Sequence, residues 1–333
     1  MQNVLRQLGA TGLVVSPLGL GLAALGRPGY INLGHAADLQ HEYDVAAMQA
    51  RTHAVLDAAW AAGVRYFDAA RSYGRGEAFL GAWLAQRQLN PPTFTVGSKW
   101  GYTYTAAWQV HADQHEVKSH TLPVLRQQWH ESYSILGPSL RLYQIHSATL
   151  ESGVLERDEV LRELAHLKAQ GVAIGLSVSG PQQAQVIERA LSVQVDGVAL
   201  FDTVQATWNV LEPSAGASLQ AAHQAGLGVI IKEALANGRL TARNTRPADA
   251  ALVQCLMAEA ERRHTTADAL ALAAVLAQPF VSVVLSGAAT VAQLHANLGA
   301  LAVAYDAPVA AAFAPYQERA PEYWHIRSSL AWN

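Results

Sequence analysis

Four side chains that could take part in proton transfer lie at or just beyond the ends of runs that predict β-strands. Asp68 and Tyr73 follow one such run. Lys99 stands near the end of the next run, and His146 ends the one after that. A lysine at the end of a buried strand needs a partner for its charge, and Asp68 on the neighbouring strand is the natural one. The pattern predicts a carboxylate, a phenol, an ammonium and an imidazole on one rim.

These four groups suit an acid/base reaction at an oxygen atom. A phenol has a pKa near ~10, which is too high for easy proton transfer at neutral pH. A neighbouring ammonium favours the phenolate and lowers that pKa, and a carboxylate keeps the ammonium charged and aimed. The imidazole of His146 can hydrogen-bond a carbonyl oxygen and orient it. The set is suited to protonating a carbonyl oxygen while a hydride is transferred to the carbonyl carbon.

Each of the four residues also has a plain structural interpretation when it is taken alone. Asp68 could cap a helix, and Tyr73 could pack against a wall. Lys99 could be a surface charge, and His146 could be a core histidine. The catalytic interpretation therefore depends on the elements that bring the four side chains to one place.

Short apolar runs alternate along the chain with longer helical patterns. The runs that predict strands are Val15–Gly21, Val64–Ala70, Phe94–Trp100, Leu140–His146, Ala173–Val178, Val198–Gln205, Gly228–Ala234 and Val281–Gly287. The helical patterns are Met48–Ala62, Glu77–Arg87, Val117–Leu136, Asp158–Gln170, Pro181–Leu191, Ala215–Ala225, Ala248–Leu276 (two helices) and Val291–Ala302. The strands are nearly continuous apolar runs, as expected when both faces of a parallel sheet are covered.

Eight strand–helix units predict an α/β fold, the closed (β/α)8 TIM barrel, rather than an open doubly wound sheet. Leu5–Gly9 and Gly12–Val14 predict an N-terminal β-hairpin that could plug the barrel floor. Two βα loops are unusually long, Gly26–Asp44 after the first strand and Gly101–Glu116 after the third. No linker-like composition divides the chain, so we expect residues 1–333 to form a single domain.

Composition narrows the classes of function. The 333 residues are 51% hydrophobic and carry a net charge of −3, which argues against disorder and against non-specific nucleic-acid binding. A single cysteine, Cys255, excludes an intramolecular disulfide and suits a reducing compartment. The N-terminal residues lack the apolar core of a signal peptide. The uncharged stretch 269–305 is broken by Gln278-Pro279 and Ser286-Gly287, which favours soluble core over a membrane span. We expect a cytoplasmic protein.

Three other segments suggest a functional site but match the corresponding motifs poorly. Gly19–Gly26 reads G-x-G-x-x-x-x-G and is not followed by a helical pattern, so it lacks the dinucleotide fingerprint. Gly175–Gly180 approaches the G-x-S-x-G nucleophile elbow, but serine stands at the fifth position. His111 and His115 could ligate a metal if they were helical. They lie in a polar loop, where a solvated surface is the better interpretation, so we predict no metal site.

The chain resembles the aldo-keto reductase superfamily over essentially its whole length. Leu8–Gly21 looks like the family's N-terminal hairpin and first strand, and Val64–Gly74 resembles its Asp/Tyr signature. Lys99 and His146 stand where the family keeps its remaining catalytic pair. Within the superfamily, the chain resembles the aldose dehydrogenase branch and the branch of potassium-channel β-subunits. The resemblance implies that Tyr73 is the general acid/base, that Lys99 and Asp68 tune it, and that His146 positions the carbonyl.

The resemblance also implies a nicotinamide dinucleotide that extends across the barrel rim without a Rossmann fold. Ser177 and Gln205 match positions that hold the carboxamide, and Trp208 matches an aromatic that stacks on the nicotinamide. Trp100 and Tyr102 are expected to form substrate-pocket walls. The implied cofactor contacts come from Gly21, Asp68, Ser177, Gln205, Trp208, Leu235, Gly238, Gly287, Gln293 and Asn297.

Several positions depart from the family's pattern. Ala69 stands where threonine is frequent, and Val178 stands where asparagine is common. Ala289 and Gln293 replace the arginine that many relatives place against the adenosine 2′-phosphate, which weakens the case for NADP(H) over NAD(H). NADP(H) stays favoured, and NAD(H) is possible. Lys232 could bind phosphate or pair with its neighbour in sequence, Glu233.

The leading hypothesis is an NAD(P)(H)-dependent oxidoreductase that interconverts an aldehyde or ketone and its alcohol, in either direction. Its partner is then a small carbonyl or alcohol, with neither nucleic acid nor membrane involved. The alternative is a nicotinamide-binding regulatory or sensor subunit with little turnover, as potassium-channel β-subunits resemble reductases yet regulate a partner. A metal hydrolase on the same barrel has only His111 and His115 in its favour.

Overall fold

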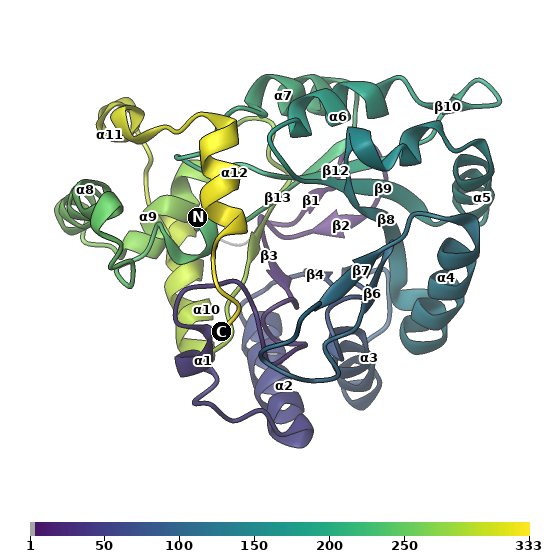
Figure 1. Ribbon diagram of the computed structural model, residues 1–333, viewed down its shortest axis with the longest axis horizontal. Helices are drawn as coiled ribbons and strands as arrows, with labels where there is room; N and C mark the ends of the chain where they lie inside the picture. The colour runs from purple at the N-terminus through teal and green to yellow at the C-terminus, as the bar shows by residue number, and fades with distance from the viewer. Residues whose placement is uncertain (1–3) are drawn as a thin grey trace.

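The computed structural model describes residues 4–333 and has a closed barrel of parallel strands at its centre. The hydrogen-bonded order is β12-β13-β14-β3-β4-β5-β8-β9, with β9 pairing back onto β12. Figure 1 shows helices packed around these strands, so the predicted (β/α)8 TIM barrel is confirmed. The barrel strands are β3 (Leu18–Gly21), β4 (Tyr66–Asp68), β5 (Thr95–Trp100), β8 (Leu140–Ala148), β9 (Ala173–Val178), β12 (Thr203–Thr207), β13 (Gly228–Lys232) and β14 (Val283–Ser286).

The helices follow the predicted patterns closely, with one short further helix in the loop after β3 and two in the tail. They are α1 (His35–Asp38), α2 (Val45–Ala61), α3 (Gly76–Gln86), α4 (Leu122–Leu136), α5 (Asp158–Ala169), α6 (Gln183–Leu191), α7 (Gly216–Gln224), α8 (Ala250–Arg262), α9 (Ala267–Leu276), α10 (Val291–Leu298), α11 (Ala307–Phe313) and α12 (Ala320–Ser328). Short 3-10 turns occupy Gly137–Ser139, Leu150–Ser152, Val154–Glu156, Ala236–Gly238, Pro247–Asp249, Gly299–Ala302 and Ala314–Tyr316.

The predicted N-terminal hairpin closes one end of the barrel. β1 (Arg6–Gln7) pairs antiparallel with β2 (Val14–Val15). Leu8 belongs to a buried apolar cluster that includes Tyr66 and other side chains from the barrel strands. Gly9 has a φ of +57°, and a side chain there would collide with the backbone of Gly228, so this close approach requires glycine. Residues 1–3, part of the segment considered above for a signal peptide, lie outside the described residues.

Two predicted elements begin five residues later in the structure than expected. The helix predicted from Val117 begins at Leu122, because 116–118 pair instead as β7 (Glu116–Lys118) with β6 (Tyr102–Tyr104). The strand predicted from Val198 begins at Thr203, because β11 (Val198–Ala199) turns back on β10 (Gln194–Val195) outside the barrel. In both places a β-prone run forms a local hairpin, which a pattern of residue types does not distinguish from its neighbour element.

The C-terminal segment folds back onto the loops that follow the barrel strands. Figure 1 shows α12 in front of the barrel and the C-terminal end beside α1. The backbones of Tyr30 and Asn333 exchange two hydrogen bonds of 3.1 and 3.2 Å. The indole of Trp332 stacks on His115, with the ring centroids 3.8 Å apart. This mouth of the barrel is therefore covered by three segments that are distant in sequence.

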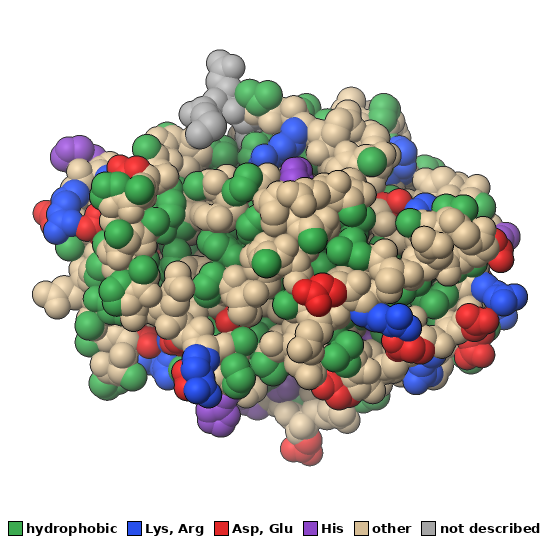
Figure 2. Space-filling model, turned by 90° about the horizontal axis from the view of Figure 1, so that it is seen from above, with side chains coloured by type: hydrophobic (Ala, Val, Ile, Leu, Met, Phe, Trp, Pro, Cys, Tyr) green, Lys and Arg blue, Asp and Glu red, His purple; other side chains and the backbone are tan. Residues whose placement is uncertain are grey.

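The surface shown in Figure 2 carries basic and acidic side chains interspersed among apolar and neutral ones. None of the helices in residues 4–333 combines the length and the apolar character needed to cross a membrane. The expectations that the chain does not bind nucleic acid and that residues 1–333 form a single domain stay predictions.

Candidate active site

Lys99 is the centre of the predicted four-residue set. Its side chain is completely buried, and its ammonium is ion-paired with the carboxylate of Asp68. The same nitrogen donates to the backbone oxygen of Ala69 at 3.0 Å and to the hydroxyl oxygen of Tyr73 at 3.2 Å. Three acceptors for three hydrogens satisfy the ammonium completely. The ammonium is thereby fixed against the phenol.

Asp68 is held by donors on every side. Its Oδ1 accepts from the hydroxyl of Tyr66 at 3.1 Å, from Nε2 of Gln205 at 3.0 Å and from Nε2 of Gln144 at 3.4 Å. These donors come from β4, β12 and β8, so the carboxylate ties together strands from across the barrel. A buried carboxylate that is paired and fully hydrogen-bonded has a fixed orientation.

Strand pairing and one tight turn bring Tyr73 to Lys99. β4 and β5 are parallel neighbours, and beyond the strand Arg71 N still donates to Lys99 O at 3.1 Å. Tyr73 N then donates to Ala70 O at 3.0 Å, which turns the chain back over the strand ends. A side chain at Gly26 would collide with the backbone oxygen of Tyr73, so the loop after β3 can close on this turn only with glycine.

The pKa of Tyr73 is raised well above the usual value of a phenol, mainly by burial and then by the charge of Asp68. The cation of Arg27 acts in the opposite direction but does not outweigh them. The sequence-based expectation of a lowered pKa is therefore wrong, because it considered the ammonium and neglected the cost of burying a phenolate. Tyr73 is a phenol, and hence a proton donor, throughout the neutral range.

His146 faces the same cavity as an uncharged imidazole. Burial, followed by the charges of Lys99 and Arg27, lowers the pKa of His146 well below its usual value. Its ring meets the ring of Tyr73 edge to face at a centroid distance of 5.6 Å. Its Nδ1 lies 3.4 Å from the hydroxyl oxygen of Ser72. A neutral imidazole carries one N–H, which can donate to an oxygen in the cavity.

A cavity of about 660 Å³ opens beside these groups, at the carboxyl ends of the barrel strands. In a TIM barrel this is the end where the active site lies. Of the four predicted catalytic residues, Asp68, Tyr73 and His146 line the cavity, and Lys99 lies directly behind them. Predicted cofactor and pocket residues that line it are Gly21, Asp68, Tyr102, Gln205, Leu235, Gly238, Gly287, Gln293 and Asn297.

Trp100 and Trp208 do not line the cavity, which corrects the roles expected for them. Successive side chains of a strand point to opposite faces, so Lys99 faces inward and Trp100 faces the helices. Trp208 likewise follows the inward-facing Thr207 and packs in the apolar layer, with its ring 6.0 Å from that of Phe280. Both indoles are buried in the apolar layer rather than exposed in the cavity.

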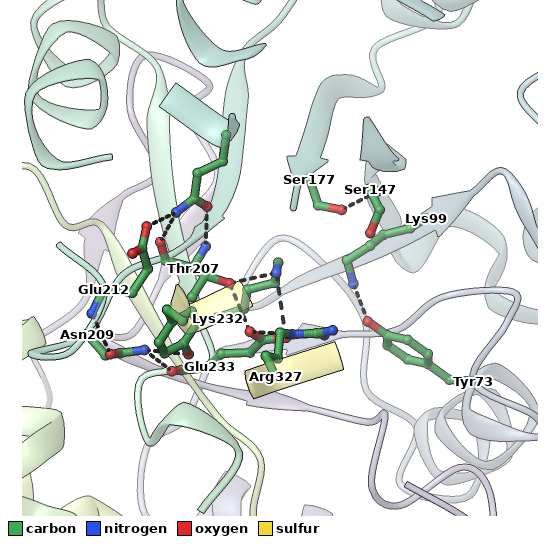
Figure 3. A network of polar contacts seen from close by, with 12 residues as sticks. Tyr73, Lys99, Ser147, Ser177, Thr207, Asn209, Glu212, Lys232, Glu233 and Arg327 are labelled. Carbon is green, nitrogen blue, oxygen red and sulfur yellow. Dashed lines mark hydrogen bonds and ion pairs between the residues drawn. The ribbon is translucent and has the colours of Figure 1, made fainter. Parts of the chain in front are cut away.

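Ser177 also lies outside the cavity lining. Its hydroxyl oxygen accepts the backbone N–H of Ser147 at 2.8 Å, as Figure 3 shows. The pairing of β8 with β9 is irregular between Ile145 and Ala148, which leaves this N–H without a strand partner. Ser177 satisfies it and so has a structural role, while the carboxamide contact expected from the sequence stays a prediction.

Residues from the tail complete the cavity in a way that sequence reasoning missed. Trp324 and Arg327 of α12, together with Trp332 beyond it, line the wall opposite the barrel strands. Arg27 also lines it, with its guanidinium carbon 5.4 Å from the ring centroid of Tyr73 and its Nη1 3.1 Å from Glu116. The available signal in the sequence is the crowding of aromatic residues in the tail, at Tyr316, Tyr323, Trp324 and Trp332.

A comparison with families of known proteins decides the class. The model of the Aldo/keto reductase family matches residues 17–314, which is most of the chain. The chain belongs to the aldo/keto reductase family. The matched range includes β3 through α11, and therefore every residue of the predicted catalytic set.

Individual relatives are distant. Norsolorinic acid reductase of Aspergillus flavus is 25% identical over 202 residues, covering 60% of this chain and 48% of that protein. Pyridoxal 4-dehydrogenase of Microbacterium luteolum is 28% identical over 216 residues, covering 56% of this chain and 58% of that one. The chain thus spans about half the length of the curated relatives it matches.

Solved structures of aldo-keto reductases share the fold along nearly the whole chain. One from Bacillus halodurans, in its holo form, superposes with a TM-score of 0.72 at 21% identity, covering 95% of this chain and 97% of that one. A putative aldo-keto reductase from Pseudomonas aeruginosa gives 0.62 at 24% identity, covering 90% of this chain and 96% of that one. At these identities the likeness concerns the fold alone.

Aldo/keto reductases generally bind a nicotinamide dinucleotide, and this cavity has polar groups suited to one. The side-chain oxygens of Asn237 and Asn297 are buried at the cavity without a hydrogen-bond partner among the described residues. Such orphaned acceptors are costly unless a ligand donates to them, and hydroxyl and amino groups of a nucleotide are donors. A side chain at Gly287 would meet only open space, so the wall is hollow there. The residues present fit the group.

Proposed function

We propose that this chain is an NAD(P)(H)-dependent oxidoreductase that interconverts an aldehyde or ketone and its alcohol, with Tyr73 as the general acid/base. One observation carries the proposal. The hydroxyl oxygen of Tyr73 accepts a hydrogen bond from Lys99, so the phenol's own hydrogen is free to point toward an oxygen in the cavity. Because the pKa of Tyr73 is raised, the phenol holds this proton until a substrate oxygen develops negative charge.

The chemistry divides between the cofactor and the chain. A bound nicotinamide supplies or accepts the hydride at the substrate carbon. During reduction the carbonyl oxygen takes the electron pair of its broken π bond and receives the proton of Tyr73. The ammonium of Lys99 stabilises the phenolate that remains, and Asp68 keeps Lys99 in place. The neutral His146 donates its N–H to the same oxygen and orients it.

The cofactor contacts are proposed for the cavity residues that match the family's pattern, namely Gly21, Asp68, Gln205, Leu235, Gly238, Gly287, Gln293 and Asn297. NADP(H) is the favoured form, and Arg243 in the cavity wall is the cation available for its 2′-phosphate. NAD(H) is the alternative, because Arg243 is already paired with Asp38 at 2.6 Å. A cytoplasmic location stays a prediction.

The substrate is proposed to be a small carbonyl compound or alcohol with an apolar or aromatic body. Rings of Tyr30, Tyr102, Trp324 and Trp332 line the cavity, and such surfaces bind apolar and aromatic molecules. The names of the two curated relatives include a reductase and a dehydrogenase, so both directions of the reaction are kept in the proposal.

The proposal is tested by mixing the purified chain with NADPH or NADH and a panel of aliphatic and aromatic aldehydes. We expect the absorbance of the reduced nicotinamide to fall over many turnovers with at least one aldehyde. Oxidation of the matching alcohols by NADP⁺ or NAD⁺ is the reverse test. Tight cofactor binding without turnover across the panel would contradict the enzyme and support a regulatory subunit.

A further inference from the structure

Lys232 is a cavity residue to which the proposed reaction assigns no task. It is the last residue of β13, and it pairs in register with Thr207 at the end of β12. Its side chain is 17% exposed, and it lines the same cavity as Tyr73 and His146. Figure 3 shows Lys232 joined to a network with Thr207, whereas Tyr73 and Lys99 form a separate pair.

The carboxylate nearest to Lys232 is already used by another cation. Arg327 donates through Nε to both oxygens of Glu233, at 2.9 and 3.0 Å, and through Nη2 to Oε1 at 2.5 Å. The hydroxyl of Thr207 donates to Oε2 of the same carboxylate at 3.0 Å. Glu233 is thus oriented toward α12, which carries Arg327, and its charge is neutralised from that side.

Lys232 itself is poorly satisfied. Its ammonium donates to Oγ1 of Thr207 at 2.8 Å, and the nearest oxygen of Glu233 lies at 3.7 Å. An ammonium has three hydrogens, so two of them have no protein oxygen at hydrogen-bond distance within residues 4–333, and the ring centroid of Trp324 lies 5.5 Å from the nitrogen. Two cations share one carboxylate here, which leaves an excess of one positive charge in a largely buried position.

The other cations of the cavity wall differ from Lys232 in having a close carboxylate of their own. Arg27 is paired with Glu116 at 3.1 Å, and Arg243 is paired with Asp38 at 2.6 Å. A buried charge without its own counter-ion is costly unless an anion approaches it. The excess charge at Lys232 therefore marks one place on the wall for a negative group.

We propose that Lys232, with Arg327 behind it, forms a subsite for an anionic oxygen, a carboxylate or a phosphate, of the molecule that occupies the cavity. This inference rests on the proposed function in that the occupant is the cofactor or the substrate of that reaction. The subsite determines which molecules the cavity prefers. A molecule that carries the anionic group gains a charge-assisted hydrogen bond from Lys232. A molecule without that group leaves the charge of Lys232 unpaired and binds less well.

Proton uptake is the measurement that a merely structural lysine would not affect. Burial lowers the pKa of Lys232 to about 8, and Lys99 and Arg327 contribute to this lowering against the opposing charge of Glu233. His146 feels the charge of Lys232 as well, but its own pKa lies well below its usual value and it stays neutral at pH 8. An anion beside Lys232 raises its pKa, so binding at pH 8 should be accompanied by proton uptake.

The first arm tests phosphate as the anion. NADPH and NADH are titrated into the chain by calorimetry at pH 8, in buffers of different ionisation enthalpy. If a cofactor phosphate sits at Lys232, Lys232→Met should weaken both affinities at least tenfold and abolish the proton uptake. Lys232→Arg is the matched control, since it keeps the charge and should retain most of the affinity.

The second arm tests carboxylate as the anion, without turnover. 4-Carboxybenzyl alcohol and 4-methylbenzyl alcohol are titrated into the complex with NADPH, which cannot react with an alcohol. If the substrate carries the anion, Lys232→Met should weaken only the carboxylated ligand, at least tenfold, and abolish its proton uptake. Unchanged affinities and unchanged proton uptake in both arms would overturn the subsite. Because both arms read binding alone, they are independent of whether hydride transfer occurs.

Discussion

The ammonium nitrogen of Lys99 lies 3.2 Å from the hydroxyl oxygen of Tyr73 and is at the same time ion-paired with Asp68. The hydrogen bond runs from lysine to tyrosine, so it stabilises the phenolate once the proton has left without taking the proton itself. A buried phenol alone would be a poor acid. The Tyr73 hydroxyl therefore stays protonated in the resting protein, and Lys99 stabilises the Tyr73 phenolate that forms during the reaction.

Removing Lys99 should cost both turnover and stability. Lys99→Met leaves the buried carboxylate of Asp68 without its cation, and breaking a buried pair from one side costs about 3–5 kcal/mol of unfolding free energy. Asp68→Asn combined with Lys99→Met removes both charges and should recover a large part of that loss. Urea unfolding of the two single variants and the double variant measures this coupling. If the double variant lost as much unfolding free energy as the two single variants together, the charges of Asp68 and Lys99 would not be coupled.

Turnover should depend on pH in opposite ways in the two directions. Tyr73 must be protonated to reduce a carbonyl, and its raised pKa keeps it protonated through pH 9. We therefore expect kcat for reduction to be flat between pH 6 and 9. Oxidation of the alcohol needs the phenolate, so its kcat should rise about tenfold per pH unit over the same range. A reduction kcat that falls with an apparent pKa near 7 would contradict a raised pKa.

Arg243 should decide the choice between cofactors if the 2′-phosphate lies beside it. Arg243→Ala should then weaken NADPH at least tenfold and NADH less than twofold, since only the first carries the phosphate. Quenching of tryptophan fluorescence measures both affinities, and Trp324 and Trp332 at the cavity are the expected reporters. Replacing Trp208 should leave the quenching unchanged, because this indole lies outside the cavity. Equal losses for both cofactors would exclude Arg243 as a phosphate ligand.

Glu233 should make the free energy of unfolding depend on pH in the acid range. Burial alone would raise the pKa of Glu233, but Arg327 and Lys232 outweigh burial and lower it to about 2. A carboxylate whose folded pKa lies below its unfolded pKa contributes stability above the unfolded value, near ~4.5, and loses it as pH falls toward 2. The contribution at neutral pH is roughly 3 kcal/mol.

Urea unfolding of the wild type and of Glu233→Gln between pH 7 and pH 3 measures this contribution. The difference between the two proteins should be constant down to about pH 5 and should shrink below it. Asp158→Asn, in an exposed ion pair with Arg162, is the matched control and should change stability by less than ~1 kcal/mol. A difference that does not change with pH would contradict a lowered pKa at Glu233.

The barrel and the meeting of the four predicted residues follow from patterns that are local in sequence. Each strand is a short apolar run, and parallel strands in a closed barrel bring their carboxyl ends to one rim, so Asp68, Lys99 and His146 had to approach one another. The hairpin at β1 and β2 was predictable for the same reason, since its paired residues are only seven and nine positions apart.

What the sequence did not indicate depends on alternation and on contacts between distant segments. Trp100 and Trp208 follow inward-facing residues and so point outward. Because side chains of a strand alternate between its two faces, an error of one position in aligning the strand places a side chain on the wrong face. The contacts of the tail, such as Trp332 with His115, join residues more than 200 positions apart. The direction of the pKa of Tyr73 depends on its burial, which only the packed structure shows.

The most direct test of Tyr73 is a single turnover followed by stopped flow. The chain is saturated with the reduced cofactor it prefers and mixed with its best aldehyde, and the nicotinamide absorbance is recorded for the wild type and for Tyr73→Phe. We predict that Tyr73→Phe binds the cofactor within threefold of the wild-type affinity and transfers hydride ~10³-fold more slowly or worse. Hydride transfer at the wild-type rate in Tyr73→Phe would contradict the account.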